Sequence, residues 1–252
     1  MKTFSAALAA VLAASTSTVA FAEPVFNRVA SFAVADNLPA DIDGKTPTSA
    51  EIITASEDGN TLIYSDSPLK AIGFIDITDA KAPKSGGIVS LEGEPTSVAA
   101  VGSKVLAAVN TRESFVKPSG FLAAVDIAGK TIDVKCDLGG QPDSVAISKD
   151  KTLAAVAIEN ERDEELNDGK LPQMPAGDLV IVSLKDGIPD CGTLKHVTLT
   201  GLADIAGDDP EPEFVAFNGK NEIALTLQEN NHIVIIDGNT AKVTGHFSAG
   251  TV

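Results

Sequence analysis

Carboxylates and side-chain amides gather at a few points of the 252-residue chain, each time at the edge of an apolar run. The stretch DDPEPEFVAF, residues 208–217, places four carboxylates directly before such a run, and residues 159–160 and 229–230 follow two others. Oxygen ligands at this density suit a hard cation, Ca²⁺ above all, which takes about 6 to 8 oxygens in flexible geometry. We predict one metal site with ligands drawn from Asp143, Glu159, Asn160, Glu211, Glu213, Glu229 and Asn230.

The same acids also have a plainer interpretation. Asp and Glu often cap turns, accept backbone N–H groups or keep an exported protein soluble. The catalytic patterns G-x-S-x-G and H-E-x-x-H and a Walker loop do not occur in the sequence. If the protein is a hydrolase, its residues best permit a metal-activated water with a carboxylate as base, and no individual catalytic residue can be assigned.

A fourfold repeat supplies the elements that would position these acids. Each unit has an apolar run, a polar turn and a second apolar run, which indicates a hairpin, and then two further short runs. The third runs, GFIDIT, LAAVDIA, DLVIVSL and HIVIIDG, recur roughly every 50 residues. Four short strands at this period are typical of a β-propeller blade. The sequence therefore predicts an all-β propeller, with a stacked β-sandwich or a β-solenoid as the alternative.

The predicted blades cover residues 49–92, 95–138, 142–200 and 212–248. Four blades are expected to form an open or irregularly closed ring, as the N-terminal part of a longer propeller, and a compact ring closed by four blades is the alternative. Val25 to Leu38 has no hairpin partner beside it, and we expect an extra outer or edge strand there. Residues 161–177 interrupt the third unit and are polar and rich in proline, which predicts a surface loop.

Propeller geometry explains why the acids would meet. The first strand of each blade starts at the same face at which the second strand ends, so both positions from successive blades surround one opening. We call this opening the acidic mouth, and we expect Glu51 and Asn110 of the first two blades to reach it as well. A bound cation there would neutralise the carboxylates and could hold a phosphate ester.

The N-terminus indicates export. Residues 1–22 contain a single charge, Lys2, then an Ala/Val/Leu-rich run and the A-x-A pattern Ala20-Phe21-Ala22, which is typical of a signal peptide cleaved after Ala22. We therefore predict a periplasmic or extracellular protein whose mature chain, residues 23–252, is one propeller domain without a membrane span. The net charge of −16 disfavours nucleic acids and anionic membranes as partners and favours cations.

Two cysteines, Cys136 and Cys191, remain in that oxidising compartment. Their spacing fits neither a C-x-x-C metal site nor a redox pair. The predicted strands place both toward the periphery of adjacent blades, so a disulfide between blades and two separate thiols are both compatible with the sequence.

Long stretches of the chain resemble a family of secreted propellers. CDLGGQPDSVAIS (residues 136–148), GLADIAGDDPEPEFVAF (201–217) and LTLQENNHIVIIDG (225–238) look like the phytase-like family, described as "esterase-like activity of phytase", and more distantly like the choice-of-anchor I propellers. The resemblance implies hydrolysis of phosphate or carboxylic esters, and the metal site predicted from the acids would make this activity depend on calcium. A non-catalytic module that binds a protein, a polysaccharide or a cationic ligand, or a scaffold domain of a larger surface protein, is the alternative.

Overall fold

The computed structural model describes residues 27–250, which form four antiparallel β-sheets. Sheet 1 contains β1 (Ile53–Ala55), β2 (Thr61–Asp66), β3 (Ala71–Asp76) and β4 (Lys84–Ser90). Sheet 2 contains β5 (Glu94–Val101), β6 (Lys104–Asn110), β7 (Gly120–Asp126) and β8 (Ile132–Asp137). Sheet 3 contains β9 (Pro142–Ile147), β10 (Leu153–Ile158), β11 (Asp178–Lys185), β12 (Ile188–Pro189) and β13 (Lys195–Thr198). Sheet 4 contains β14 (Pro212–Phe217), β15 (Glu222–Leu227), β16 (His232–Asp237) and β17 (Lys242–Ser248).

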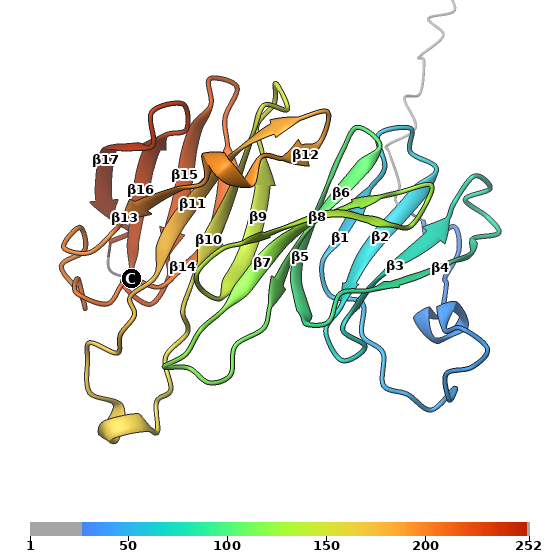
Figure 1. Ribbon diagram of the computed structural model, residues 1–252, viewed down its shortest axis with the longest axis horizontal. Coiled ribbons are helices and arrows are strands. Elements are labelled where there is room, and N and C mark those ends of the chain that lie inside the picture. The colour runs from blue at the N-terminus through green and yellow to red at the C-terminus, as the bar shows by residue number, and fades with distance from the viewer. Residues whose placement is uncertain (1–26, 251–252) are drawn as a thin grey trace, which may run out of the picture.

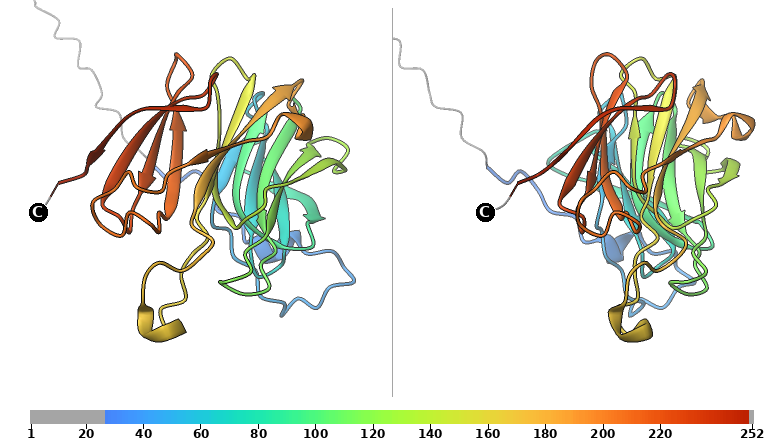
Figure 2. Two further views of the ribbon diagram at one scale, coloured as in Figure 1. Left: turned by 60° about the vertical axis from the view of Figure 1, so that its left-hand side comes forward. Right: turned by 90° about the vertical axis from the view of Figure 1, so that its left-hand side faces the viewer.

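The sheets lie side by side in chain order, from β1–β4 on one flank to β14–β17 on the other (Figures 1 and 2). The first strands of neighbouring sheets contact one another in turn, β1 with β5, β5 with β9 and β9 with β14. This radial arrangement is that of propeller blades, and the four blades do not close into a ring. The predicted fold class, the number of blades and their limits are confirmed.

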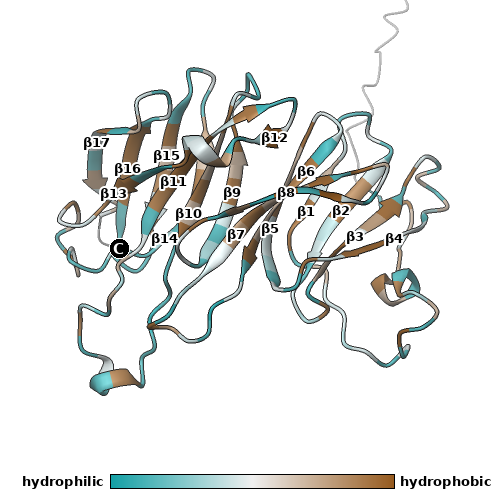
Figure 3. Cartoon of the chain, in the orientation of Figure 1, coloured by the Kyte–Doolittle hydropathy of each residue, from teal (hydrophilic) through white to brown (hydrophobic). Residues whose placement is uncertain are grey.

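Small residues let the sheets approach closely. Residues of β6 and β7 such as Ala107, Ala108, Ala123 and Ala124 are fully buried, and larger apolar side chains fill the space between blades. Because sheets 2 and 3 have a neighbour on each side, their middle strands β6, β7, β10 and β11 are apolar on both faces, and much of this part of the ribbon is brown or pale in Figure 3.

Within residues 27–250, sheet 4 has a neighbouring sheet on one face only. Ile223, Leu225 and Val234 are fully buried against sheet 3, whereas Phe214 is 65% exposed and Phe247 53% exposed. The strict alternation of buried and exposed residues along β15 is the pattern of a sheet with one covered face.

Two serines at equivalent positions of the first strands join neighbouring blades. Each inner strand of sheets 2 and 3 contains the pattern Pro-x-Ser-Val, at residues 95–98 and 142–145. Ser97 Oγ accepts from the backbone N–H of Val145, 3.2 Å away, and Ser144 Oγ accepts from that of Val215, 3.1 Å away. Sheet 4 has Phe214 at this position.

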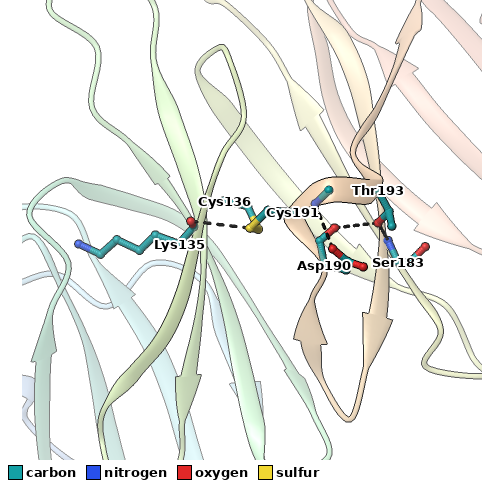
Figure 4. Close-up of a disulfide and its surroundings, with 7 residues drawn as sticks. Lys135, Cys136, Ser183, Asp190, Cys191 and Thr193 are labelled. Carbon is teal, nitrogen blue, oxygen red and sulfur yellow. Dashed lines mark hydrogen bonds between the residues drawn. A yellow bond between two sulfur atoms is a disulfide. The ribbon is translucent and has the colours of Figure 1, made fainter.

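A disulfide between Cys136 and Cys191 ties sheet 2 to sheet 3 at the periphery (Figure 4). Cys136 lies in β8, and Cys191 begins the short 3₁₀ helix η3 (Cys191–Thr193) that precedes β13. The two Cα atoms are 5.2 Å apart, within the usual range for a disulfide. Of the two alternatives that the sequence left open, the disulfide between blades is therefore the one that the structure shows.

The N-terminal segment differs from the prediction. Residues 27–38 contain no strand; they are extended coil followed by the 3₁₀ helix η1 (Val34–Asn37). Asn37 is buried, and its side-chain amide donates to Tyr64 Oη and to the carbonyl of Phe74 while accepting from the N–H of Gly87. The segment is therefore fastened beside β3 and β4 of sheet 1 by one buried amide, without any strand pairing.

Two predictions concern residues outside the described range. The signal peptide, residues 1–22, and the start of the stretch from Val25 lie there. Within residues 27–250, the structure contains no helix long and apolar enough to cross a membrane.

Residues 161–177 form a loop below the sheets (Figure 1), with the 3₁₀ helix η2 (Leu166–Gly169) at its tip. The predicted surface loop is confirmed in position. Gln173 nevertheless packs inside, because its backbone N–H donates to Asp209 Oδ2 at 2.8 Å and its Oε1 accepts from the N–H of Asp163. The loop is thus fastened to the segment that precedes β14.

Candidate functional site

The acidic mouth forms where sheets 3 and 4 meet, because the repeat places acids at equivalent positions. Asp143 and Glu213 each follow the proline that begins an inner strand, β9 or β14, and these two strands are neighbours. Burial, and then the nearby charge of Glu161, raises the pKa of Asp143 to about 6. Burial raises the pKa of Glu213 as well, with Asp143 and Glu229 adding repulsion.

Glu159, directly after β10, has the most crowded position of the mouth. Its pKa is raised to about 8, first by burial and then by the charges of Asp143, Glu161, Glu213 and Glu211. Carboxylates of β9, of β14 and the segment before it, and of the insertion (residues 161–177) therefore act on one side chain. A proton or another cation must accompany this group at neutral pH.

Arg162, the second residue of the insertion, compensates part of the negative charge of these carboxylates. Its Nε contacts Glu211, and its Nη2 lies 3.8 Å from Glu229. Burial raises the pKa of Glu211 to about 7 in spite of the opposing effect of Arg162. The guanidinium thus offsets only part of the cost of burying the carboxylates.

A cavity of about 510 Å³ opens beside these groups. Residues that line it include Glu159, Glu161, Arg162, Gln173, Glu211 and Glu229. Three of the seven predicted site residues therefore share one cavity. Asp143 and Glu213 lie close enough to Glu159 to raise its pKa but are not part of the cavity wall.

The two predicted asparagines have structural contacts. Asn160 Oδ1 accepts from the backbone N–H of Gln141, and Asn230 Oδ1 accepts from that of Glu211, each at 2.9 Å. Both side chains are buried and also donate to backbone carbonyls. These amides fix the loops at the ends of β10 and β15. Their role as metal ligands stays a prediction.

The described residues contain no group of three or more His, Cys, Asp or Glu side chains arranged to hold a metal ion. The donors are carboxylate oxygens, which suit Ca²⁺. These carboxylates line the wall of a cavity and do not surround one common centre. Binding one ion would require several of these side chains to turn toward a common centre. The calcium site stays a prediction.

The first two sheets contribute less to the mouth than expected. Glu51 is exposed and accepts a hydrogen bond from Ser67 Oγ at 2.9 Å. Asn110 is buried, accepts from the N–H of Arg112 and lines a separate cavity of about 270 Å³. Burial, and then the charge of Glu51, raises the pKa of Asp66, whereas the carboxylates that act on Glu159 belong to sheets 3 and 4, their adjoining segments and the insertion.

Arg112 is a mouth residue that the sequence interpretation missed. Its Nη1 donates to Gln141 Oε1 at 2.8 Å and to Glu161 Oε2 at 2.5 Å, and its guanidinium lies 4.0 Å from the ring centre of Phe115. The chain contains three arginines, Arg28, Arg112 and Arg162, and two of them lie at the mouth. The rarity of arginine beside sixteen lysines was the available signal.

Comparison with known proteins supports the fold. No curated protein sequence matches the chain. Hydrazine synthase of Kuenenia stuttgartiensis is similar in structure, with a TM-score of 0.56 and 18% identity over 74% of this chain and 52% of that one, so the chain spans about half its length. A protein of unknown function from Bacteroides caccae gives a TM-score of 0.49 and 10% identity over 81% of this chain and 62% of that one. At these identities, the hydrazine synthase likeness concerns the fold alone.

The sequence comparison identifies a family. The choice-of-anchor I domain matches residues 51–252, which begin two residues before β1 and include all four sheets. The more distant of the two resemblances is thereby confirmed, and the phytase-like one stays a prediction. On this match, the chain belongs to the choice-of-anchor I domain family.

Proposed function

We propose that this chain is a binding module of an exported protein and that it holds a cationic ligand in the acidic mouth. The observation that carries the proposal is Glu159, whose pKa is raised to about 8 by burial and by four surrounding carboxylates. A site with this excess of buried acid gains free energy when a cation enters. Arg112 and Arg162 contact Glu161 and Glu211 and leave Glu159 without a cationic partner among the described residues.

Export is supported by three features. The disulfide Cys136–Cys191 is of a kind that persists in oxidising compartments. The predicted signal peptide points the same way, and a choice-of-anchor domain suggests a secreted or cell-surface protein. Such a location is periplasmic or extracellular.

The test measures thermal unfolding at pH 8 with and without 5 mM CaCl₂ or spermidine, roughly the range in which weak cation sites fill. At least one of the two cations is expected to raise the melting temperature of the wild type. Glu159→Gln combined with Glu213→Gln should remove that gain. The matched control, Asp36→Asn with Asp186→Asn, removes two exposed charges away from the mouth and should keep it. Equal gains in both double variants would show that the cation acts on net charge and would refute the proposal.

A second candidate function is a calcium-dependent ester hydrolase of the phytase-like type. It is supported by the pKa of Asp143, raised to about 6, and that of Glu159, raised to about 8, because acids and bases near neutrality suit proton transfer. Turnover of p-nitrophenyl phosphate or p-nitrophenyl acetate that needs Ca²⁺, disappears in EDTA and is lost in Glu159→Gln would favour it. Binding without turnover selects the first candidate.

A further inference from the structure

The cavity at the acidic mouth contains a feature that a bare cation does not satisfy. Gln173 lines this cavity and is nine-tenths buried. Its Oε1 accepts from the N–H of Asp163, but its Nε2 has no hydrogen-bond partner among residues 27–250. A buried amide donor without an acceptor is costly. A ligand that fits this wall therefore brings an acceptor oxygen as well as positive charge.

The mouth already binds guanidinium groups of its own chain. Arg162 pairs with Glu211, and Arg112 pairs with Glu161. Guanidinium suits such walls because its planar fork of donors matches carboxylate geometry and because it is weakly hydrated. Glu159 and Glu229 line the same cavity, and Glu229 reaches Arg162 only at 3.8 Å. These two carboxylates remain for a further cation.

The size and rim of the cavity also favour an organic ligand. A volume of about 510 Å³ lies in the range of sites for organic molecules and far exceeds the space of one ion. Leu171 lines the cavity and is 48% exposed, so an aliphatic stem can pack on it. The described residues offer no ready-made group of metal ligands, as noted above.

We propose, on the basis of the function proposed above, that the ligand of the mouth is a basic peptide segment. An Arg or Lys side chain of the partner enters the cavity against Glu159 and Glu229, and its aliphatic stem lies along Leu171. The side-chain amide of Gln173, whose Nε2 is closed off from solvent in the free protein, turns toward the cavity and donates to a main-chain carbonyl of the peptide. Charge complementarity fits this partner, because the chain has a net charge of −16.

Two blocked peptides test this inference, Ac-Gly-Arg-Gly-Arg-Gly-NH₂ and the same peptide with citrulline in place of arginine. Citrulline keeps the shape and removes the charge. Isothermal titration at pH 8 and low salt should show binding of the arginine peptide and at least tenfold weaker binding of the citrulline peptide. Glu159→Gln with Glu229→Gln should weaken the arginine peptide at least tenfold, whereas Asp36→Asn with Asp186→Asn should not.

Gln173 is tested with a ligand that lacks a carbonyl. Methylguanidine provides the cation alone, so Gln173→Leu should weaken the arginine peptide several-fold and leave methylguanidine unchanged. An unaltered circular dichroism spectrum and melting temperature show that the variant is folded. Equal loss for both ligands would overturn the role of Gln173 in binding a carbonyl.

The outcomes separate this inference from the proposed function. If CaCl₂ or spermidine acts through the mouth and the arginine peptide does not bind, the peptide inference is wrong and the cation-binding function stands. If neither small cations nor the peptide bind, both are wrong. Equal binding of the arginine and citrulline peptides also contradicts the inference.

Discussion

The interface between sheets 2 and 3 and that between sheets 3 and 4 use the same device in different surroundings. Each has one inner-strand serine that accepts a backbone N–H of the next blade, Ser97 in the first and Ser144 in the second. Each also buries a continuous apolar cluster. Only the first interface has a disulfide, and only the second brings together the carboxylates around Glu159.

The first interface contains the covalent bond that stabilises the fold, whereas the second contains the carboxylates proposed to bind a ligand. The disulfide joins β8 to the segment before β13, in the outer parts of sheets 2 and 3 (Figure 4), whereas the carboxylates of the mouth lie at the ends of β9, β10 and β14. The second interface carries buried carboxylates with raised pKa values, which weaken folding at neutral pH. Sites that bind ligands often sacrifice stability in this way.

The largest expected effect is on the first interface. Changing Cys136 and Cys191 together to Ser should lower the free energy of unfolding by about 4 kcal/mol, since the bond closes a loop of 55 residues in sequence separation. Urea denaturation under non-reducing conditions measures the loss. A reducing agent should destabilise the wild type to a similar extent and leave the variant unchanged. An unchanged midpoint in the variant would mean that packing alone joins sheets 2 and 3.

The next effect is a pH dependence of the second interface. The folded pKa of Glu159, about 8, is above its unfolded value, so its contribution to stability is complete below the unfolded pKa and is lost as the pH rises through about 8. Between pH 5 and pH 9 the wild type should lose roughly 2 kcal/mol more than Glu159→Gln, after a discount for solvent screening at the mouth. Urea denaturation at both pH values gives the comparison. Equal losses in the two proteins would show that folding does not raise the pKa of Glu159.

A smaller loss of stability is expected when either of the two serines is replaced by alanine. Ser144 Oγ both accepts from the N–H of Val215 and donates to the carbonyl of Glu213 at 2.5 Å, whereas Ser97 Oγ accepts one bond from Val145. Ser144→Ala should cost about 1 kcal/mol, and Ser97→Ala less, because fewer buried groups lose a partner. Thermal unfolding of both variants tests this order. A larger loss for Ser97→Ala would reverse the comparison.

The smallest effect is at the equivalent position of sheet 4. Phe214 replaces the serine of the repeat and is 65% exposed, so its ring has little burial to lose. Phe214→Ser should change the free energy of unfolding by no more than about 0.5 kcal/mol in either direction. A loss of several times that size would show that the ring is covered in solution.

Much of the fold could be predicted because the repeat is local. Each blade is a run of strands joined by short turns, so pattern and period sufficed for limits such as 95–138. The path of residues 27–38 could not be predicted, because Asn37 acts through contacts 27 to 50 residues away. A buried amide of this kind leaves no periodic signal.

The candidate site was predictable in part for the same reason. Asp143 and Glu213 meet because they occupy one repeat position on adjacent strands, and the sequence shows that equivalence. The structural contacts of Asn160 and Asn230 and the ion pairs of Arg162 depend on side-chain packing and loop paths. The spacing of residues along the chain indicates neither the side-chain packing nor the loop paths.

The disulfide has a consequence for proteolysis. It joins residues 136 and 191, and the exposed tip of the insertion, at residues 164–170, lies between them in the chain. Exposed loop tips are preferred sites of proteolytic cleavage. A single cut there would divide the backbone into two polypeptides that remain one covalent molecule, and they would migrate separately on a gel only after reduction.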